Sequence, residues 1–115
     1  MSETRTAVVT GASSGIGEAT VRLLRSHGWD VVGVARRADR LARLADETGA
    51  ATFVADVTSD ADVEALVTFL RERGQVNALV NVAGGAIGAD PIEHAPLDAW
   101  RQMYETNVLG VVRVT

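Results

Sequence analysis

The sequence predicts an open α/β fold in which helices cover both faces of a parallel sheet. Four short apolar runs, at residues 7–10, 31–35, 52–55 and 78–80, alternate with segments of helical periodicity. This alternation is expected for β-α-β units. The runs are apolar throughout, which is typical of strands buried on both faces. We therefore expect a doubly wound parallel sheet with the strand order 3-2-1-4.

Apolar side chains recur at helical spacing between the runs. They are Ile16, Ala19, Thr20, Leu23 and Leu24, then Leu41, Leu44 and Ala45, then Val63, Leu66, Val67 and Leu70. Each pattern stops near a glycine (Gly28, Gly49 or Gly74), and Ser59 is placed to cap the third helix. Residues 83–96 are expected to form a glycine-bearing loop, and residues 97–115 a last helix.

Composition narrows the class of protein. The 115 residues give room for one domain, and 47% of them are hydrophobic, which excludes a disordered chain. No apolar run approaches the ~20 residues of a membrane span. The net charge of −4 has the wrong sign for non-specific nucleic-acid binding, and without cysteine there is no disulfide or thiolate metal site. We expect a soluble, cytoplasmic protein that binds neither nucleic acid nor a membrane.

The predicted sheet is incomplete. A doubly wound nucleotide-binding sheet usually has two β-α-β-α-β halves, and the sequence supplies only the first fully. The fourth strand would end the sheet as a bare apolar edge, which native proteins normally cover. We therefore interpret residues 1–115 as a dinucleotide-binding domain that is the N-terminal part of a longer, single-domain protein.

Three glycines lie between the first strand and the first helix, in the segment TGASSGIG at residues 10–17. Glycines there allow a tight turn and a close approach of the backbone to a phosphate, and the N–H groups that begin the helix bind its negative charge. A plain glycine turn is the alternative, but the position between strand and helix favours a site of the Rossmann type. The candidate cofactor-binding residues of this turn are Gly11, Ser13, Ser14, Gly15, Ile16 and Gly17.

The spacing of these glycines, together with their flanking residues, resembles the short-chain dehydrogenase/reductase family, and the resemblance covers the whole chain. It implies an oxidoreductase that transfers a hydride between NADP(H) and a small alcohol or carbonyl compound. It also implies that this stretch supplies the cofactor site and that the complete protein is a homodimer or homotetramer.

Arg36 and Arg37 follow the second strand, where an acidic residue would bind the ribose 2′-hydroxyl of NAD. No carboxylate is present there, and an arginine accommodates the 2′-phosphate of NADP. NADP is therefore favoured over NAD, with Arg36 as the main contact and a hydroxyl from Ser13 or Ser14 as a possible addition. The alternative is a solvated pair of arginines that leads into a helix.

Asp56 and Val57 end the third strand. Asp56 matches the family's aspartate that accepts a hydrogen bond from the adenine amino group; without the resemblance it would be a strand-end or helix-capping residue. Residues 79–84 resemble the family's Asn-Asn-Ala-Gly segment, whose small residues let the cofactor's ribose lie against the backbone. Val82 stands in place of the second asparagine. The segment adds Asn81, Ala83 and Gly84 to the cofactor-binding candidates.

Asn107 matches the catalytic asparagine of the family, which holds a water in the proton relay; a hydrogen-bonded core asparagine at a helix bend is the alternative. The family also needs a serine and a tyrosine with a lysine four residues later. Here the only tyrosine is Tyr104, followed four residues later by Val108, and the chain contains no lysine. We therefore expect residues 1–115 alone to be inactive. Two distant histidines without cysteine predict no metal site.

Two other functions compete with the oxidoreductase. One is a non-catalytic nucleotide-binding or interaction module, which applies if the natural chain ends near residue 115. The other is a methyltransferase that uses S-adenosylmethionine, but such folds favour an acidic residue after the second strand, where this chain has Arg36. The substrate itself cannot be inferred from fold analogy.

Overall fold

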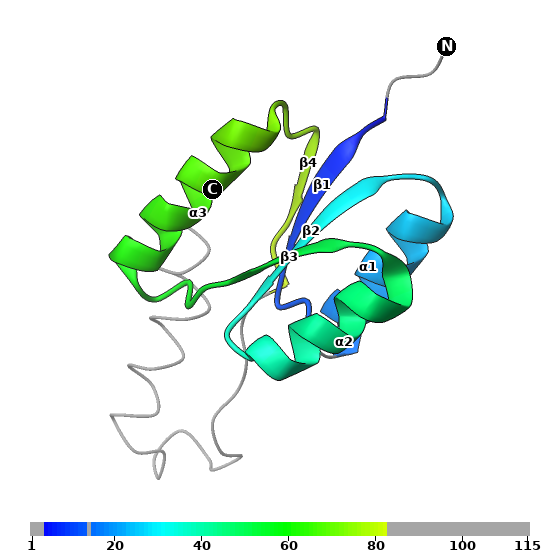
Figure 1. The fold of residues 1–115 in the computed structure, drawn as a ribbon, viewed down its shortest axis with the longest axis horizontal. Helices are drawn as coiled ribbons and strands as arrows, with labels where there is room; N and C mark the ends of the chain where they lie inside the picture. The colour runs from blue at the N-terminus through cyan, green and yellow to red at the C-terminus, as the bar shows by residue number, and fades with distance from the viewer. Residues whose placement is uncertain (1–3, 14, 83–115) are drawn as a thin grey trace, which may run out of the picture.

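A computed structural model describes residues 4–13 and 15–82 of the protein as a parallel sheet between two layers of helices (Figure 1). The strands are β1 (Thr6–Thr10), β2 (Asp30–Ala35), β3 (Ala51–Val54) and β4 (Ala78–Val80). The helices are α1 (Gly15–Ser26), α2 (Ala38–Thr48) and α3 (Asp60–Arg73). Helices α1 and α2 cover one face of the sheet and α3 covers the other. The strand order is β3-β2-β1-β4, which confirms the predicted fold class.

The register brings the ends of the strands to common edges. Thr10 pairs with Val34 on β2, and Ala35 in turn pairs with Val54 on β3. Because all pairings are parallel, the segments that follow the strands lie together at one edge. We call this the carboxyl edge (residues 11–13, 36–37, 55–59 and 81–82). The helix ends and segments that lead into the strands form the amino edge (residues 4–5, 25–29, 48–50 and 73–77).

Two apolar clusters fill the space between the sheet and its helices, one on each face. Val9 of β1 packs with Val21, Leu41 and Leu44 under α1 and α2, whereas its neighbour Val8 packs on the α3 side. The cluster under α3 also contains Val32, Val34 and Leu66, with the rings of Phe53 and Phe69 5.0 Å apart at its margin. Successive strand residues therefore pack on opposite faces, which explains why apolar residues occupy consecutive positions in the strands.

The apolar stripe predicted for α1 is wrong by about one position. Ile16 is 75% exposed and Leu23 is 60% exposed, whereas Gly17 and Val21 are buried. The physical reason is the close contact of Gly17 with the turn before the helix: a Cβ on Gly17 would lie 1.9 Å from the carbonyl oxygen of Gly11. This contact turns the face that carries Gly17 and Val21 toward the sheet. Val67 on α3 is also more exposed, at 39%, than its predicted place in the core stripe.

The predicted helix ends are observed at two places where the caps are well defined. The Ser59 side chain accepts a hydrogen bond from the Asp62 N–H at 3.2 Å, which caps the start of α3. Gly49 ends α2 with a φ of 76°, and its N–H donates to the Ala45 carbonyl at 2.8 Å. Strand β3 begins and ends one residue earlier than predicted. Across the described ranges, no helix is both long enough and apolar enough to span a bilayer.

Candidate cofactor site

The glycine turn lies where the chain passes from β1 to α1. Gly11 has a φ of 66° and Gly15 a φ of 57°, a left-handed conformation that side chains disfavour. The Ala12 N–H donates to the Val34 carbonyl at 3.2 Å, which draws the turn over the end of β2. Gly33 on β2 leaves room for this approach, because a Cβ there would lie 3.1 Å from the Ala12 Cβ. The turn is therefore fixed at the carboxyl edge.

The glycines of the turn have different surroundings. Gly17 is packed against the Gly11 backbone, so that any side chain would clash with the turn. At Gly15, in contrast, a Cβ would meet nothing within 4 Å among the described residues. The first N–H groups of a helix have no partner within it, and they attract negative charge. Gly17 thus shapes the turn, whereas Gly15 is not crowded by any other residue that the structure describes.

Thr10 joins the glycine turn to the end of β4. Its side chain is almost completely buried, and its hydroxyl oxygen accepts a hydrogen bond from the Val82 N–H at 3.0 Å. The same hydroxyl donates to the Val80 carbonyl at 3.5 Å. These two contacts flank Asn81, which is exposed at the carboxyl edge. Sequence analysis did not select Thr10; the signal was a hydroxyl residue at the end of an apolar strand.

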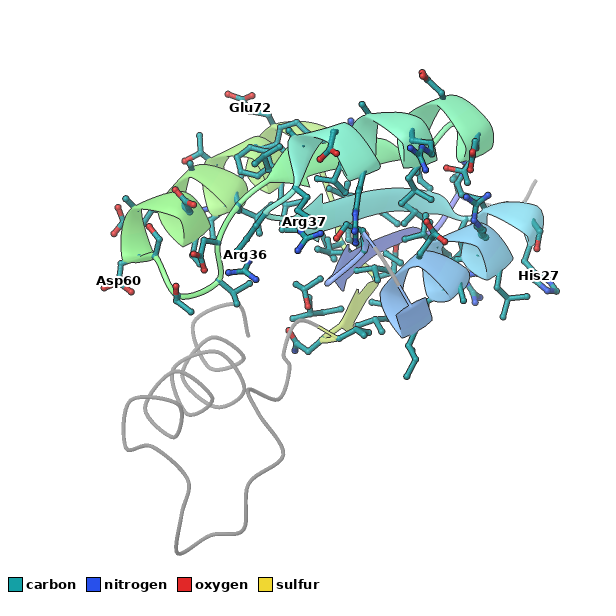
Figure 2. The ribbon with its side chains drawn as sticks, turned by 90° about the horizontal axis from the view of Figure 1, so that it is seen from below. His27, Arg36, Arg37, Asp60 and Glu72 are labelled. Carbon is teal, nitrogen blue, oxygen red and sulfur yellow. The ribbon has the colours of Figure 1, made fainter. Side chains whose placement is uncertain are left out.

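Arg36 and Arg37 lie at the carboxyl edge between β2 and α2, and both are exposed. Neither guanidinium forms an ion pair with a carboxylate of residues 4–13 or 15–82. Figure 2 shows Arg36 toward the same end of the molecule as Asp60, and His27 at the opposite end. The N-terminus of α2, which begins at Ala38, adds partial positive charge to the two arginines. This part of the edge is suited to an anionic group.

Asp56 follows β3, next to the arginines. The Ala55 N–H donates to the Ala35 carbonyl at 2.9 Å, so the chain after β3 remains beside the chain after β2. Asp56 Oδ1 accepts hydrogen bonds from the Thr58 N–H at 2.9 Å and from Thr58 Oγ1 at 2.6 Å. The Asp56 N–H donates to Asp62 Oδ2 at 2.8 Å. The carboxylate therefore lies in a turn whose geometry is set by side chains from both of its ends.

The carboxyl edge and the adjoining start of α1 thus bring together most of the residues selected from the sequence. Those in the described part of the chain are Gly11, Ser13, Gly15, Ile16, Gly17, Arg36, Arg37, Asp56, Val57 and Asn81. Ser14, Ala83, Gly84 and Asn107 lie outside the described residues. Among the residues that the structure describes, no group of three or more histidine or acidic side chains is arranged to hold a metal ion.

A parallel sheet of this order, with a glycine turn where the helices change from one face to the other, defines a nucleotide-binding α/β protein. The sequence model of the family described as short chain dehydrogenase matches residues 5–115. The chain belongs to this family.

Two relatives and one solved structure illustrate the similarity. An uncharacterized oxidoreductase of Mycobacterium tuberculosis is 58% identical over 111 residues, which are 96% of this chain and 43% of that protein. Serine 3-dehydrogenase of Agrobacterium fabrum is 40% identical over 113 residues, 96% of this chain and 45% of that one. The closed form of a serine dehydrogenase complexed with NADP⁺ superposes with a TM-score of 0.90 at 35% identity, over 95% of this chain and 45% of the other. The chain therefore spans less than half the length of these proteins.

Proposed function

We propose that residues 1–115 form the cofactor-binding part of an NADP-dependent oxidoreductase that acts on a small alcohol or carbonyl compound. The observation that carries this proposal is the pair of exposed arginines beside the glycine turn. Arg36 and Arg37 have no carboxylate partner in the described ranges, and an anion at this edge would meet both guanidinium groups and the start of α2. The NADP⁺ held by a similar serine dehydrogenase supports the same cofactor here.

The residues present fit a dinucleotide phosphate. In the proposal, the pyrophosphate lies at the glycine turn, where Gly15 leaves the backbone uncovered. Arg36 binds the 2′-phosphate through parallel N–H donors, with Arg37 and a hydroxyl of Ser13 or Ser14 in support. The adenine lies against the Asp56–Val57 segment. When bound, the nicotinamide supplies or accepts the hydride.

The proposed position of the nicotinamide half of the cofactor is inferred from the hydrogen bonds of Thr10. By holding the end of β4 against β1, Thr10 keeps Asn81 beside the turn, and the proposal places the ribose of the nicotinamide half along residues 81–84. Asn107 is proposed to support proton transfer. Because the 115 residues contain no lysine to pair with a catalytic tyrosine, we expect them to bind cofactor without turnover. We further propose that the complete protein is cytoplasmic and assembles as a homodimer or homotetramer.

The test is a fluorescence titration of the complete natural protein with NADPH and with NADH. Changing Arg36 to Asp should weaken NADPH binding by ~10–100-fold, because a charge-assisted bidentate contact becomes a repulsion, and should change NADH binding little. Arg71→Asp is the matched control, because Arg71 is also an exposed arginine but lies on α3. Equal affinity of the native protein for the two cofactors would refute the NADP assignment.

A second measurement separates the enzyme from the non-catalytic module. The complete protein is assayed for NADPH oxidation with a panel of aldehydes and ketones, beside a protein that ends at Thr115. Turnover only by the complete protein supports the proposal. Cofactor binding without turnover on any carbonyl compound would favour the nucleotide-binding module instead.

A further inference from the structure

The turn after β3 contains a carboxylate whose direction is fixed within the protein. Asp56 Oδ1 accepts two hydrogen bonds from one residue, at 2.9 Å from the Thr58 N–H and at 2.6 Å from the Thr58 hydroxyl. Because a carboxylate is planar, holding one oxygen from two directions restricts the rotation of the whole group. The Thr58 hydroxyl is therefore a second restraint beyond the backbone contact that many aspartates make in turns.

The backbone of the same turn is held independently of this hydroxyl. The Asp56 N–H donates to Asp62 Oδ2 at 2.8 Å, and the Asp56 carbonyl accepts from the Ser59 N–H at 2.9 Å. Ser59 in turn caps α3, whose first turn carries Asp62. Loss of the Thr58 hydroxyl should therefore leave the path of the chain intact. Its removal would release the Asp56 side chain alone.

The atoms offered by this segment match one edge of adenine. A carboxylate only accepts hydrogen bonds, whereas a backbone N–H only donates. The Val57 N–H has no hydrogen-bond acceptor elsewhere in the described chain. Adenine carries a donor at its 6-amino group next to an acceptor at N1, which complements this acceptor and donor pair. Hypoxanthine carries the opposite pair, a 6-oxo acceptor next to an N1–H donor.

We propose that Thr58 is a positioning residue that gives the cofactor site its selectivity for adenine, by holding the Asp56 carboxylate toward the 6-amino group. The inference rests on the proposed function, because it takes the Asp56–Val57 segment to be where the base binds. Thr58 acts through Asp56 and does not itself touch the cofactor. Its hydroxyl determines how well the site distinguishes a 6-amino from a 6-oxo purine.

The experiment measures the dissociation constants of NADPH and of its analogue with hypoxanthine in place of adenine, on the complete protein. The native protein should prefer NADPH by ~10-fold or more, the value of one charge-assisted hydrogen bond. In Thr58→Val, which keeps the shape of the side chain but has no hydroxyl, this ratio should fall at least ~3-fold. Thr58→Ser keeps the donor and should retain the native ratio.

The matched control is Thr68→Val. Thr68 also donates its hydroxyl, to the Glu64 carbonyl on α3, but it lies away from the carboxyl edge. A purely structural loss would weaken both cofactors together and leave their ratio unchanged, so the ratio isolates the positioning role. Thermal unfolding of each variant by circular dichroism verifies that it is folded. If Thr58→Val does not fold, Thr58→Ala takes its place.

The outcomes separate this proposal from the function on which it rests. A native protein that does not bind NADPH refutes the proposed function. If the native protein binds NADPH but shows no preference for adenine, or if Thr58→Val keeps the full preference, only the positioning role is refuted. If neither Thr58 variant folds, the hydroxyl is required for the structure, and the positioning role is likewise rejected.

Discussion

The two edges of the sheet both carry arginines, but among the residues that the structure describes only arginines at the amino edge bind carbonyl or carboxylate groups. At the amino edge, the Arg25 guanidinium donates to the carbonyls of Thr48 and Trp29, each at 3.0 Å. Arg73 lies 3.8 Å from the Asp30 carboxylate. At the carboxyl edge, the guanidinium groups that follow β2 have no carboxylate partner within the described residues. Within the described residues, the same residue type is bound to the protein at one edge and lacks a carboxylate partner at the other.

A pocket of about 890 Å³ at the amino edge illustrates the difference. Arg5, Trp29 and Asn77 are among the residues that line it, and their groups already contact the protein. The Arg5 guanidinium lies 5.8 Å from the centre of the Trp29 ring, and the Asn77 side chain accepts from the Thr6 N–H at 2.9 Å. The pairing of charged groups therefore distinguishes the two edges better than the presence of a hollow or the type of residue does.

The largest effects are expected from two glycines of the turn. Substitution of one should mainly lower stability, and substitution of the other should mainly weaken cofactor binding. Gly17→Ala should lower the free energy of unfolding by about 3 kcal/mol, because its Cβ would overlap the Gly11 carbonyl and the backbone would have to move. Gly15→Ala should cost only about 1 kcal/mol, from its positive φ, but should sharply weaken NADPH binding. Urea unfolding and NADPH titration measure the two quantities. Equal losses of stability would contradict the division.

The second prediction concerns replacing one arginine at each edge by methionine. Arg25→Met should lower the free energy of unfolding by about 2 kcal/mol, since two partly buried carbonyls lose their donor, and should leave NADPH affinity unchanged. Arg36→Met should weaken NADPH binding and leave the free energy of unfolding unchanged. Unfolding curves and NADPH titrations on both variants measure stability and cofactor affinity side by side. A loss of cofactor affinity in Arg25→Met would show that the edges are not independent.

A smaller change is expected at Thr10, which holds the end of β4. Thr10→Val keeps the volume but leaves the Val82 N–H without its acceptor, at a cost of about 1 kcal/mol. Thr10→Ser should recover most of this loss. Amide hydrogen exchange at Val82 should accelerate in the valine variant alone. Unchanged protection there would mean that the hydroxyl does not anchor the strand.

The smallest effect concerns an exposed ion pair on the outer surface of α1 and α2. The Arg22 side chain hydrogen-bonds Glu47, and this contact lowers the pKa of the Glu47 carboxyl below its usual value. A depressed folded-state pKa stabilises the fold above the unfolded-state pKa, and this contribution is lost as the pH falls through the folded-state value. Glu47→Gln should therefore lower the melting temperature slightly at pH 7, and not at a pH below the folded-state pKa.

The control for this pair is Asp46→Asn, a neighbouring exposed carboxylate that forms no ion pair in the described ranges. It should change the melting temperature less at pH 7. High salt should also reduce the effect of Glu47→Gln, because the pair is exposed to solvent. A difference between Glu47→Gln and the native protein that persists at acidic pH would point to packing of the side chain instead.

The sheet was predictable because its signal is local. Parallel strands buried on both faces are near-continuous apolar runs, and Ser59 marks the start of α3 by a hydroxyl placed before its helix. The glycine turn and the arginines after β2 were found for the same reason, since each follows a recognisable apolar run. Residue type and position along the chain were sufficient for these.

The rest depended on contacts that the sequence pattern does not record. The buried face of α1 follows from the packing of Gly17 on Gly11, so the periodicity of the larger apolar residues misplaced it. Thr10 and Thr58 act through hydrogen bonds of single hydroxyl groups. The Thr10 hydroxyl accepts from Val82, far along the chain, and the Thr58 hydroxyl donates to the Asp56 side chain two residues before it. Hydroxyl residues are common at such positions, and only the geometry distinguishes these two.

The bond between Thr10 and Val82 also has a consequence for biosynthesis. The two residues are 72 positions apart, so the hydrogen bond from the Val82 N–H to the hydroxyl that borders the glycine turn cannot form until the segment after β4 has been translated. Parallel pairings of this kind join distant segments and form slowly, since a long loop must close first. Strands β1 and β2 can meet earlier, but the turn between β1 and α1 would lack its contacts with residues 80 and 82. A nascent chain arrested before β4 emerges from the ribosome should therefore fail to capture the cofactor, even though every residue of the glycine turn has already been made.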